Sequence, residues 1–155
     1  MLHFITIDIN KHSEVAIGFR KDSFAASFGD ASDFGDEKKY LNWLEIMVKD
    51  FPDGFVMVEK DNRLIGQLEL TIKEDIDRKI GYVNLYYLVP EIRGNGIGKE
   101  LHNYASSFFK SQNLYEFHLR VSPTNTSALK FYQKLGMEEI GQELDGKVIR
   151  MKGFL

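Results

Sequence analysis

The sequence has no cysteine, and this absence excludes several kinds of chemistry together. Without thiols the chain cannot form disulfides, bind metals through thiolates or use a cysteine nucleophile. This composition is compatible with the cytoplasm, where we expect the protein to function. No run approaches the ~18 apolar residues of a membrane span. Residues 1–10, MLHFITIDIN, lack the basic segment and long apolar stretch of a signal peptide, so we expect no membrane association.

Net charge and proline content are also low. The net charge is only −3 and no long basic stripe occurs, which argues against nucleic-acid binding. The four histidines, His3, His12, His102 and His118, show no metal-ligand spacing, so we expect no metal site. The three prolines all lie at plausible element boundaries. With 155 residues, 43% of them hydrophobic, the chain suits a single domain over residues 1–155.

Hydrophobic periodicity divides the chain into alternating and helical segments. Strands are predicted at residues 4–9, 55–60, 64–73, 79–89, 115–121, 137–144 and 147–155. Helices are predicted at residues 12–28, 37–50, 98–112 and 125–135, the last ending at Gly136. The order is strand, two helices, three strands, helix, strand, helix and two strands. It predicts a mixed α/β or α+β fold with helices packed on one sheet.

The segment Arg93–Gly98, RGNGIG, joins a predicted strand to a predicted helix. It fails the dinucleotide fingerprint, because its glycines read G-x-G-x-G and Lys99 follows them. It also fails the ATP-loop pattern, which needs a glycine where Arg93 stands and Ser or Thr where Glu100 stands. Unpaired N–H groups and the dipole at a helix start still favour a phosphate. A strand-to-helix turn without a ligand is the alternative.

A second segment, NTSALKFYQKLGM, begins the helix predicted at residues 125–135. Asn125, Ala128, Leu129 and Tyr132 are spaced to share one helical face. A polar cap, a small residue and a phenol in one stripe suit a narrow ligand lying alongside. The alternative is an ordinary N-cap followed by core residues.

Together the two segments resemble the GNAT superfamily of acetyl-CoA-dependent N-acetyltransferases. RGNGIG is similar to the family's Arg/Gln-x-x-Gly-x-Gly/Ala loop. NTSALKFYQKLGM is similar to its Asn-x-x-Ala-x-x-Phe-Tyr…Leu-Gly-Phe segment, with Met137 in place of the final Phe. The resemblance implies a mostly antiparallel sheet of six to seven strands flanked by about four helices. It also implies acetyl transfer from acetyl-CoA to a primary amine of a small molecule or protein.

The resemblance assigns roles on the donor side. Backbone N–H groups would hold the coenzyme A pyrophosphate at Arg93, Gly94, Asn95, Gly96, Ile97, Gly98 and Lys99. A bulge in strand four, mapped to Leu88 and Val89, would expose backbone groups to pantetheine and the acetyl carbonyl. The Leu88 N–H would stabilise the oxyanion. Asn125 would lie beside pantetheine, and Tyr132 would protonate the departing thiolate as general acid.

The general base is less defined by the sequence. Some family members use a glutamate in strand four, but residues 81–87, GYVNLYY, contain no carboxylate. Alternation places Gln67, Glu69 and Thr71 on one face of the neighbouring strand, so Glu69 could act through water. The alternative is that Glu69 faces solvent.

The acceptor side has the weakest signals. Four tyrosine or asparagine side chains could line it, at least two of them packing instead: Tyr82, Asn84, Tyr86 and Tyr87. The loop containing Asp30, Asp33, Asp36 and Glu37 would favour a cationic amine if it overhangs the cleft, and is otherwise a solvated acidic loop. The amine is not identified. A homodimer through a C-terminal strand is plausible, and a non-catalytic acyl-CoA-binding regulatory module is the alternative function.

Overall fold

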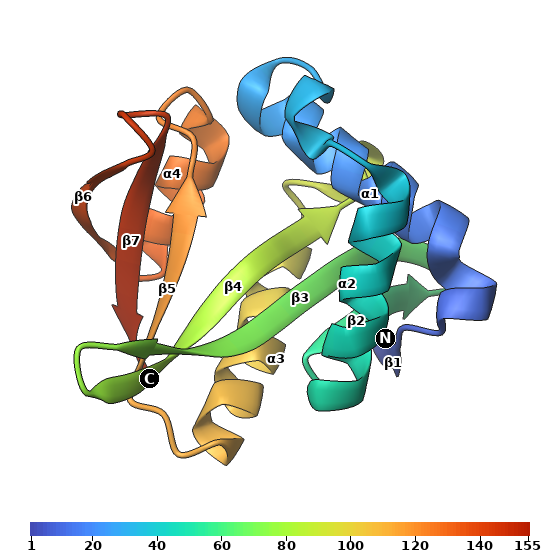
Figure 1. The fold of residues 1–155 in the computed structure, drawn as a ribbon, viewed down its shortest axis with the longest axis horizontal. Helices are drawn as coiled ribbons and strands as arrows, with labels where there is room; N and C mark the ends of the chain where they lie inside the picture. Colours follow the sequence, from blue (N-terminus) through green and yellow to red (C-terminus); the bar gives the residue numbers. More distant parts are fainter.

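Seven strands form one sheet in the computed structural model, which describes residues 1–155. The strand order across the sheet is β1-β2-β3-β4-β5-β7-β6 (Figure 1). In chain order the elements are β1 His3–Thr6, α1 Ile9–Phe28, η1 Ser32–Phe34, α2 Glu37–Asp50, β2 Phe55–Lys60, β3 Arg63–Asp75, β4 Arg78–Leu88, η2 Pro90–Ile92, α3 Ile97–Ser111, β5 Glu116–Val121, α4 Thr126–Lys134, β6 Glu138–Glu143 and β7 Val148–Phe154. Only the β4–β5 pair is parallel, so the predicted mixed, mostly antiparallel fold is confirmed.

The predicted order of helices and strands is confirmed, with one displaced boundary near the N-terminus. The strand predicted at residues 4–9 ends at Thr6, and α1 begins at Ile9. The cause is Asp8, whose Oδ1 accepts hydrogen bonds from the backbone N–H groups of Asn10 and Lys11. An N-cap of this kind satisfies amides that have no partner inside the helix, and so starts the helix early.

Two helices cover each face of the sheet. α1 and α2 lie on one face and enclose a small core with β1 and β2 that includes Ala16, Leu44 and Phe55. α3 and α4 lie on the opposite face (Figure 1). The larger core lies under α3, where Leu101 and Phe109 are buried against the central strands.

A β-bulge in β4 changes which side chains face which helices. Val83 pairs with Leu70 and Leu85 pairs with Glu69, so Asn84 is an extra residue in β4. Beyond an extra residue the alternation of side chains is shifted by one position.

The two tyrosines after Asn84 show this shift, because regular alternation would place Tyr86, and not Tyr87, on the same face as Tyr82 and Asn84. The Tyr87 hydroxyl donates to Asp22 of α1 at 2.5 Å. The Tyr86 hydroxyl instead lies 3.4 Å from Nδ1 of His102 on α3. The two side chains therefore point to opposite faces, and only Tyr87 lies on the α1 side.

β4 and β5 pair over three positions and then separate. The paired residues are Gly81, Val83 and the Tyr82 between them, opposite Phe117–Leu119. Glycine is required at 81, because a Cβ there would lie 2.6 Å from the Phe109 ring. In Figure 1 the carboxyl ends of β4 and β5 diverge toward α1 and α4. The edge of β4 that faces β5 is therefore unpaired after Val83.

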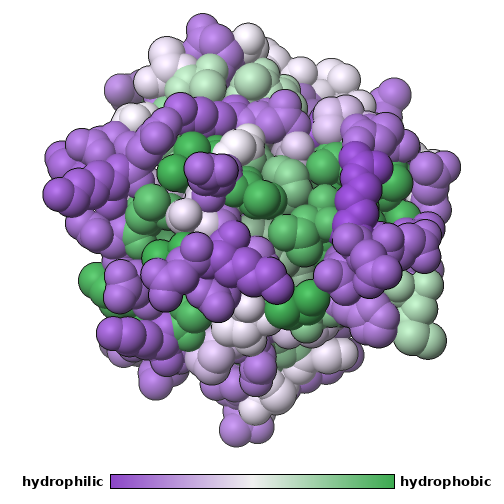
Figure 2. Space-filling model, turned by 90° about the vertical axis from the view of Figure 1, so that its right-hand side faces the viewer, coloured by the Kyte–Doolittle hydropathy of each residue, from purple (hydrophilic) through white to green (hydrophobic).

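The two edges of the sheet are β1 and β6. β7 lies between β5 and β6, so at this end a second copy could add a strand only to β6. On the face shown in Figure 2, apolar patches are separated by hydrophilic residues. None of the helices is long and apolar enough to cross a membrane.

Candidate functional site

The loop before α3 has the backbone geometry of an anion site. Gly94 and Gly96 adopt positive φ angles of 84° and 79°, a region where L side chains are strained. α3 begins at Ile97 with Gly96 as its N-cap, and no side chain caps it. The Lys99 N–H donates to the Gly96 carbonyl at 3.2 Å, but the amides before it in the first turn lack such partners, and the helix dipole favours negative charge there. Lys99 adds an exposed cation in that turn.

The third glycine of the loop has a different role. A Cβ on Gly98 would lie 3.1 Å from Cζ of Phe131, closer than ordinary van der Waals contact. Phe131 belongs to α4, so Gly98 lets the two sequence segments pack directly on each other. Phe131 thus has a packing role.

The side chain of Arg93 is held by protein groups. Its Nε donates to the Leu88 carbonyl at 2.8 Å, and its guanidinium lies 3.3 Å from Asp22. Its charge is therefore partly balanced, and the residue ties the loop to the end of β4 and to α1. Lys99 forms no ion pair, so its positive charge beside the loop is less balanced than that of Arg93.

The N–H groups of Leu88 and Val89, both expected near the acetyl group, differ in whether they are already hydrogen-bonded. The Val89 N–H donates to the Ile65 carbonyl at 2.8 Å and is not free. This bond makes Leu88 and Gly66 a non-hydrogen-bonded pair, in which the N–H of each residue points away from the other strand. The Leu88 N–H accordingly faces the space between β4 and β5. The bulge expected at Leu88 and Val89 is wrong in position, because the extra residue is Asn84.

Asn125 and Tyr132 lie at the start and near the end of α4. Asn125 is the N-cap, and its Oδ1 accepts from the Ala128 N–H at 3.3 Å. The half-buried ring of Tyr132 lies 6.3 Å, centroid to centroid, from Tyr86 of β4. Burial alone raises the pKa of Tyr132 to about 12, so its hydroxyl remains protonated at neutral pH.

Glu69 is fully buried, so the alternative that its carboxylate faces solvent is wrong. One carboxylate oxygen accepts from the Tyr40 hydroxyl at 2.5 Å and from Gln67 Nε2 at 2.8 Å. The other lies 3.1 Å from the Arg20 guanidinium. Burial, and then the charge of Glu69, raise the pKa of Tyr40 far above its usual value. Glu69 thus joins α1 and α2 to the sheet and is not exposed to a bound amine.

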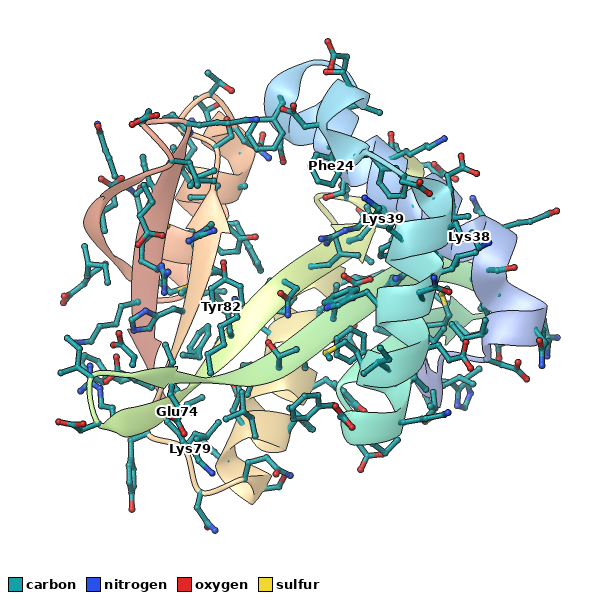
Figure 3. The ribbon with its side chains drawn as sticks, in the orientation of Figure 1. Phe24, Lys38, Lys39, Glu74, Lys79 and Tyr82 are labelled. Carbon is teal, nitrogen blue, oxygen red and sulfur yellow. The ribbon has the colours of Figure 1, made fainter.

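A cavity of about 330 Å³ lies on the α1 side of the sheet where β4 and β5 separate. Figure 3 shows two of its walls, with Phe24 on α1 and Tyr82 on β4. The lining residues are Arg20, Ser23, Phe24, Ser27, Phe28, Lys73, Tyr82, Val83, Asn84, Arg120, Ser122 and Val148. Of the four side chains expected on the acceptor side, Tyr82 and Asn84 line this cavity. Tyr86 and Tyr87 do not line it.

A second cavity of about 460 Å³ lies between α1, η1 and α2. It shares Arg20 and Phe24 with the first and is otherwise lined by Phe34, Gly35, Asp36, Lys39, Tyr40 and Trp43. It does not reach β4 or β5, so the cavity at the strand separation is the better acceptor site.

The carboxylates of the acidic loop, residues 30–37, already have partners within the protein. Asp33 pairs with Lys147 and Glu37 with Lys21. Asp30 accepts from Ser32, and Asp36 caps α2. None of these carboxylates lines the cavity at the strand separation, so they do not make it acidic.

Sequence reasoning missed all three cations of that cavity, Arg20, Lys73 and Arg120. Strand alternation was the available signal, since Thr71 and Lys73 share a face of β3. Arg120, from the distant strand β5, could be placed there only by the three-dimensional fold. No three His, Asp or Glu side chains gather in a metal-binding group.

Comparison with known proteins agrees with this geometry. The Acetyltransferase (GNAT) family matches residues 20–137, which include both segments and the strand β5 between them. A coenzyme A complex of the PaiA N-acetyltransferase from Thermoplasma acidophilum has the same fold. Its TM-score is 0.81 at 22% identity, with 100% of this chain and 99% of that chain covered.

Two proteins that match by sequence are longer than this chain. An uncharacterized N-acetyltransferase of Methanocaldococcus jannaschii is 29% identical over 107 residues, which are 66% of this chain and 47% of that protein. A mycothiol acetyltransferase of Streptomyces griseus is 28% identical over 101 residues, which are 65% of this chain and 30% of that protein. The matched part is thus half or less of these curated relatives. The family match covers most of the chain, which therefore belongs to the Acetyltransferase (GNAT) family.

Proposed function

We propose that this protein transfers an acetyl group from acetyl-CoA to a primary amine. The observation that carries the proposal is the separation of β4 from β5. It leaves the Leu88 N–H facing the gap, and a cavity lies against both strands at the same place. A thioester inserted between the strands would present its carbonyl to an amine in that cavity.

On the donor side, the pyrophosphate would lie against the loop from Arg93 to Lys99. The positive φ angles of Gly94 and Gly96 bring the backbone close to a ligand, and the uncapped start of α3 supplies N–H groups. Pantetheine would then pass between Leu88 and Asn125. This path places the sulfur on the side of the sheet where Tyr132 lies.

The chemistry follows from these positions. The amine nitrogen forms a bond to the acetyl carbon, and the Leu88 N–H stabilises the oxyanion. The C–S bond then breaks, and its electron pair leaves on sulfur. Tyr132 protonates this thiolate and regains a proton from solvent, while the amine gives its proton to water. We assign Glu69 a positioning role, because its buried carboxylate holds Arg20 and Tyr40 and offers the amine no direct contact.

Release of free coenzyme A thiol tests the proposal. Incubation with acetyl-CoA and a panel of primary amines is expected to release thiol in proportion to the N-acetylated product, measured by mass spectrometry. Tight acetyl-CoA binding without turnover on any amine would instead favour the non-catalytic acyl-CoA-binding module. That second function is favoured by one observation, the absence of a carboxylate from the cavity lining.

A substitution at Gly98 tests the donor loop. Gly98→Ala forces the Phe131 ring to move, because the new Cβ lies 3.1 Å from Cζ of that ring. Overpacking of this kind costs about 1–3 kcal/mol, and if the loop shifts to relieve the clash its N–H groups lose their alignment with the pyrophosphate, so coenzyme A affinity measured by calorimetry is expected to fall roughly tenfold. The double variant Gly98→Ala, Phe131→Leu removes the clash and should regain affinity. An unchanged dissociation constant for Gly98→Ala would contradict the assigned contact.

A further inference from the structure

The cavity at the strand separation is lined by cations and by no carboxylate. Arg20 reaches it from α1, Lys73 from β3 and Arg120 from β5. The three elements are far apart in sequence, so the fold itself gathers these charges. The rest of the lining is aromatic, aliphatic or neutral polar.

Only part of this positive charge is balanced within the protein. Arg20 is paired with the buried carboxylate of Glu69 at 3.1 Å. Arg120 and Arg150 share one carboxylate oxygen of Glu143, at 2.8 Å and 3.0 Å. Two guanidinium groups therefore face a single negative charge beside the cavity.

Lys73 adds to this excess of positive charge. Its Nζ lies 3.8 Å from the centroid of the Tyr82 ring and forms no ion pair. The Arg150 guanidinium lies 5.4 Å from the same ring. Burial, and then repulsion by Arg120 and Arg150, lower the pKa of Lys73, and the opposing effect of the Glu143 charge is smaller.

The volume of the cavity and the segments that cover it indicate a small ligand. A volume of about 330 Å³ is at the lower end of the range for small-molecule sites. The end of α1 and the η1 segment that follows it are each held across the cavity by one contact. The Thr124 hydroxyl donates to the Ser27 carbonyl at 3.2 Å, and Lys147 pairs with Asp33 of η1. An extended peptide would have to break these contacts to enter from that side.

We propose that the acceptor is a small primary amine that also carries an anionic group, either a carboxylate or a phosphate. Lys73 and Arg120 hold the anion, and the amine points toward the gap between β4 and β5. The inference rests on the proposed acetyl transfer and adds the chemical class of the acceptor. A polyamine would meet like charges at this site, which disfavours it.

Matched amines test the charge requirement. O-phosphoethanolamine is compared with ethanolamine, and β-alanine with β-alaninamide, with spermidine as the cationic case. In the thiol-release assay, kcat/KM is expected to be roughly tenfold or more higher for the anionic member of at least one pair. The pair that responds shows whether the anion is a phosphate or a carboxylate.

Charge-removing variants locate the effect. Lys73→Met and Arg120→Met are each expected to lower the ratio of kcat/KM between the anionic and neutral members of the pair. Lys79→Met is the control, since this exposed lysine of β4 lies outside the cavity lining (Figure 3). Its ratio should equal that of the unmodified protein.

Two outcomes overturn the acceptor class while leaving acetyl transfer intact. One is faster turnover of spermidine or of the neutral amines, and the other is a ratio unaffected by both Lys73→Met and Arg120→Met. If no amine releases thiol, acetyl transfer itself fails. The anion site is then judged by calorimetric titration of O-phosphoethanolamine and β-alanine in the presence of coenzyme A. Binding that Lys73→Met weakens supports the site, and absence of binding overturns it.

Discussion

Replacing Tyr132 with phenylalanine is expected to lower kcat by roughly 10²–10⁴-fold, the range for loss of a general acid. Coenzyme A affinity should change little, because the aromatic ring and its packing against Tyr86 remain. The lost group is the hydroxyl that we propose protonates the departing thiolate. Steady-state thiol release at saturating amine measures kcat, and calorimetry with coenzyme A measures affinity.

The matched control is Tyr115→Phe, since Tyr115 is 83% exposed and lies outside the site. A pH profile adds a second readout. Burial raises the pKa of Tyr132 to about 12, so its acid form persists as pH rises toward that value. The unmodified enzyme should therefore show no loss of kcat from this group between pH 7 and 10. Turnover of Tyr132→Phe equal to that of the control would remove Tyr132 from the mechanism.

Replacing Glu69 with glutamine is expected to reduce the free energy of unfolding by about 3–5 kcal/mol, as for other broken buried ion pairs. The substitution leaves Arg20 next to a neutral amide, 3.1 Å from where its counter-ion had been. It also changes the acceptor of the Tyr40 hydroxyl. Urea unfolding followed by circular dichroism measures the loss.

Two further variants separate the ion pair from general effects of substitution. Glu45→Gln, on the exposed side of α2, should change stability by no more than about 0.5 kcal/mol. The double variant Arg20→Met, Glu69→Leu removes both charges and should regain much of the stability lost in Glu69→Gln. If Glu69→Gln unfolds at the same urea concentration as Glu45→Gln, the buried pair does not stabilise the fold.

The elements were predictable where their signals are local. α2 spans the predicted residues 37–50, because Asp36 caps its start and the sequence FPDG follows its end. The loop before α3 was predictable for the same reason, since its glycines satisfy backbone requirements that do not depend on distant residues.

The missed features depend on residues brought together by the fold. The bulge at Asn84 is defined by which residues of β3 it faces, so β4 alone carries no signal for it. The burial of Glu69 requires Arg20 from α1 and Tyr40 from α2. The positive charge of the proposed acceptor cavity comes from side chains of both β3 and β5. The acidic loop that stood out in the sequence instead forms a helix cap and surface ion pairs.

The extra residue at Asn84 has a consequence for how this protein can diversify. Up to and including the extra residue, Tyr82 and Asn84 line the proposed acceptor cavity. Beyond it, Tyr86 faces α3 and the Leu88 N–H faces the gap. In the proposed reaction, one strand thus carries two separable sets of positions, one that contacts the amine and one that contacts the thioester. Mutations in the first set can alter substrate choice while the second stays constant, so a new acceptor can be acquired without rebuilding the donor site.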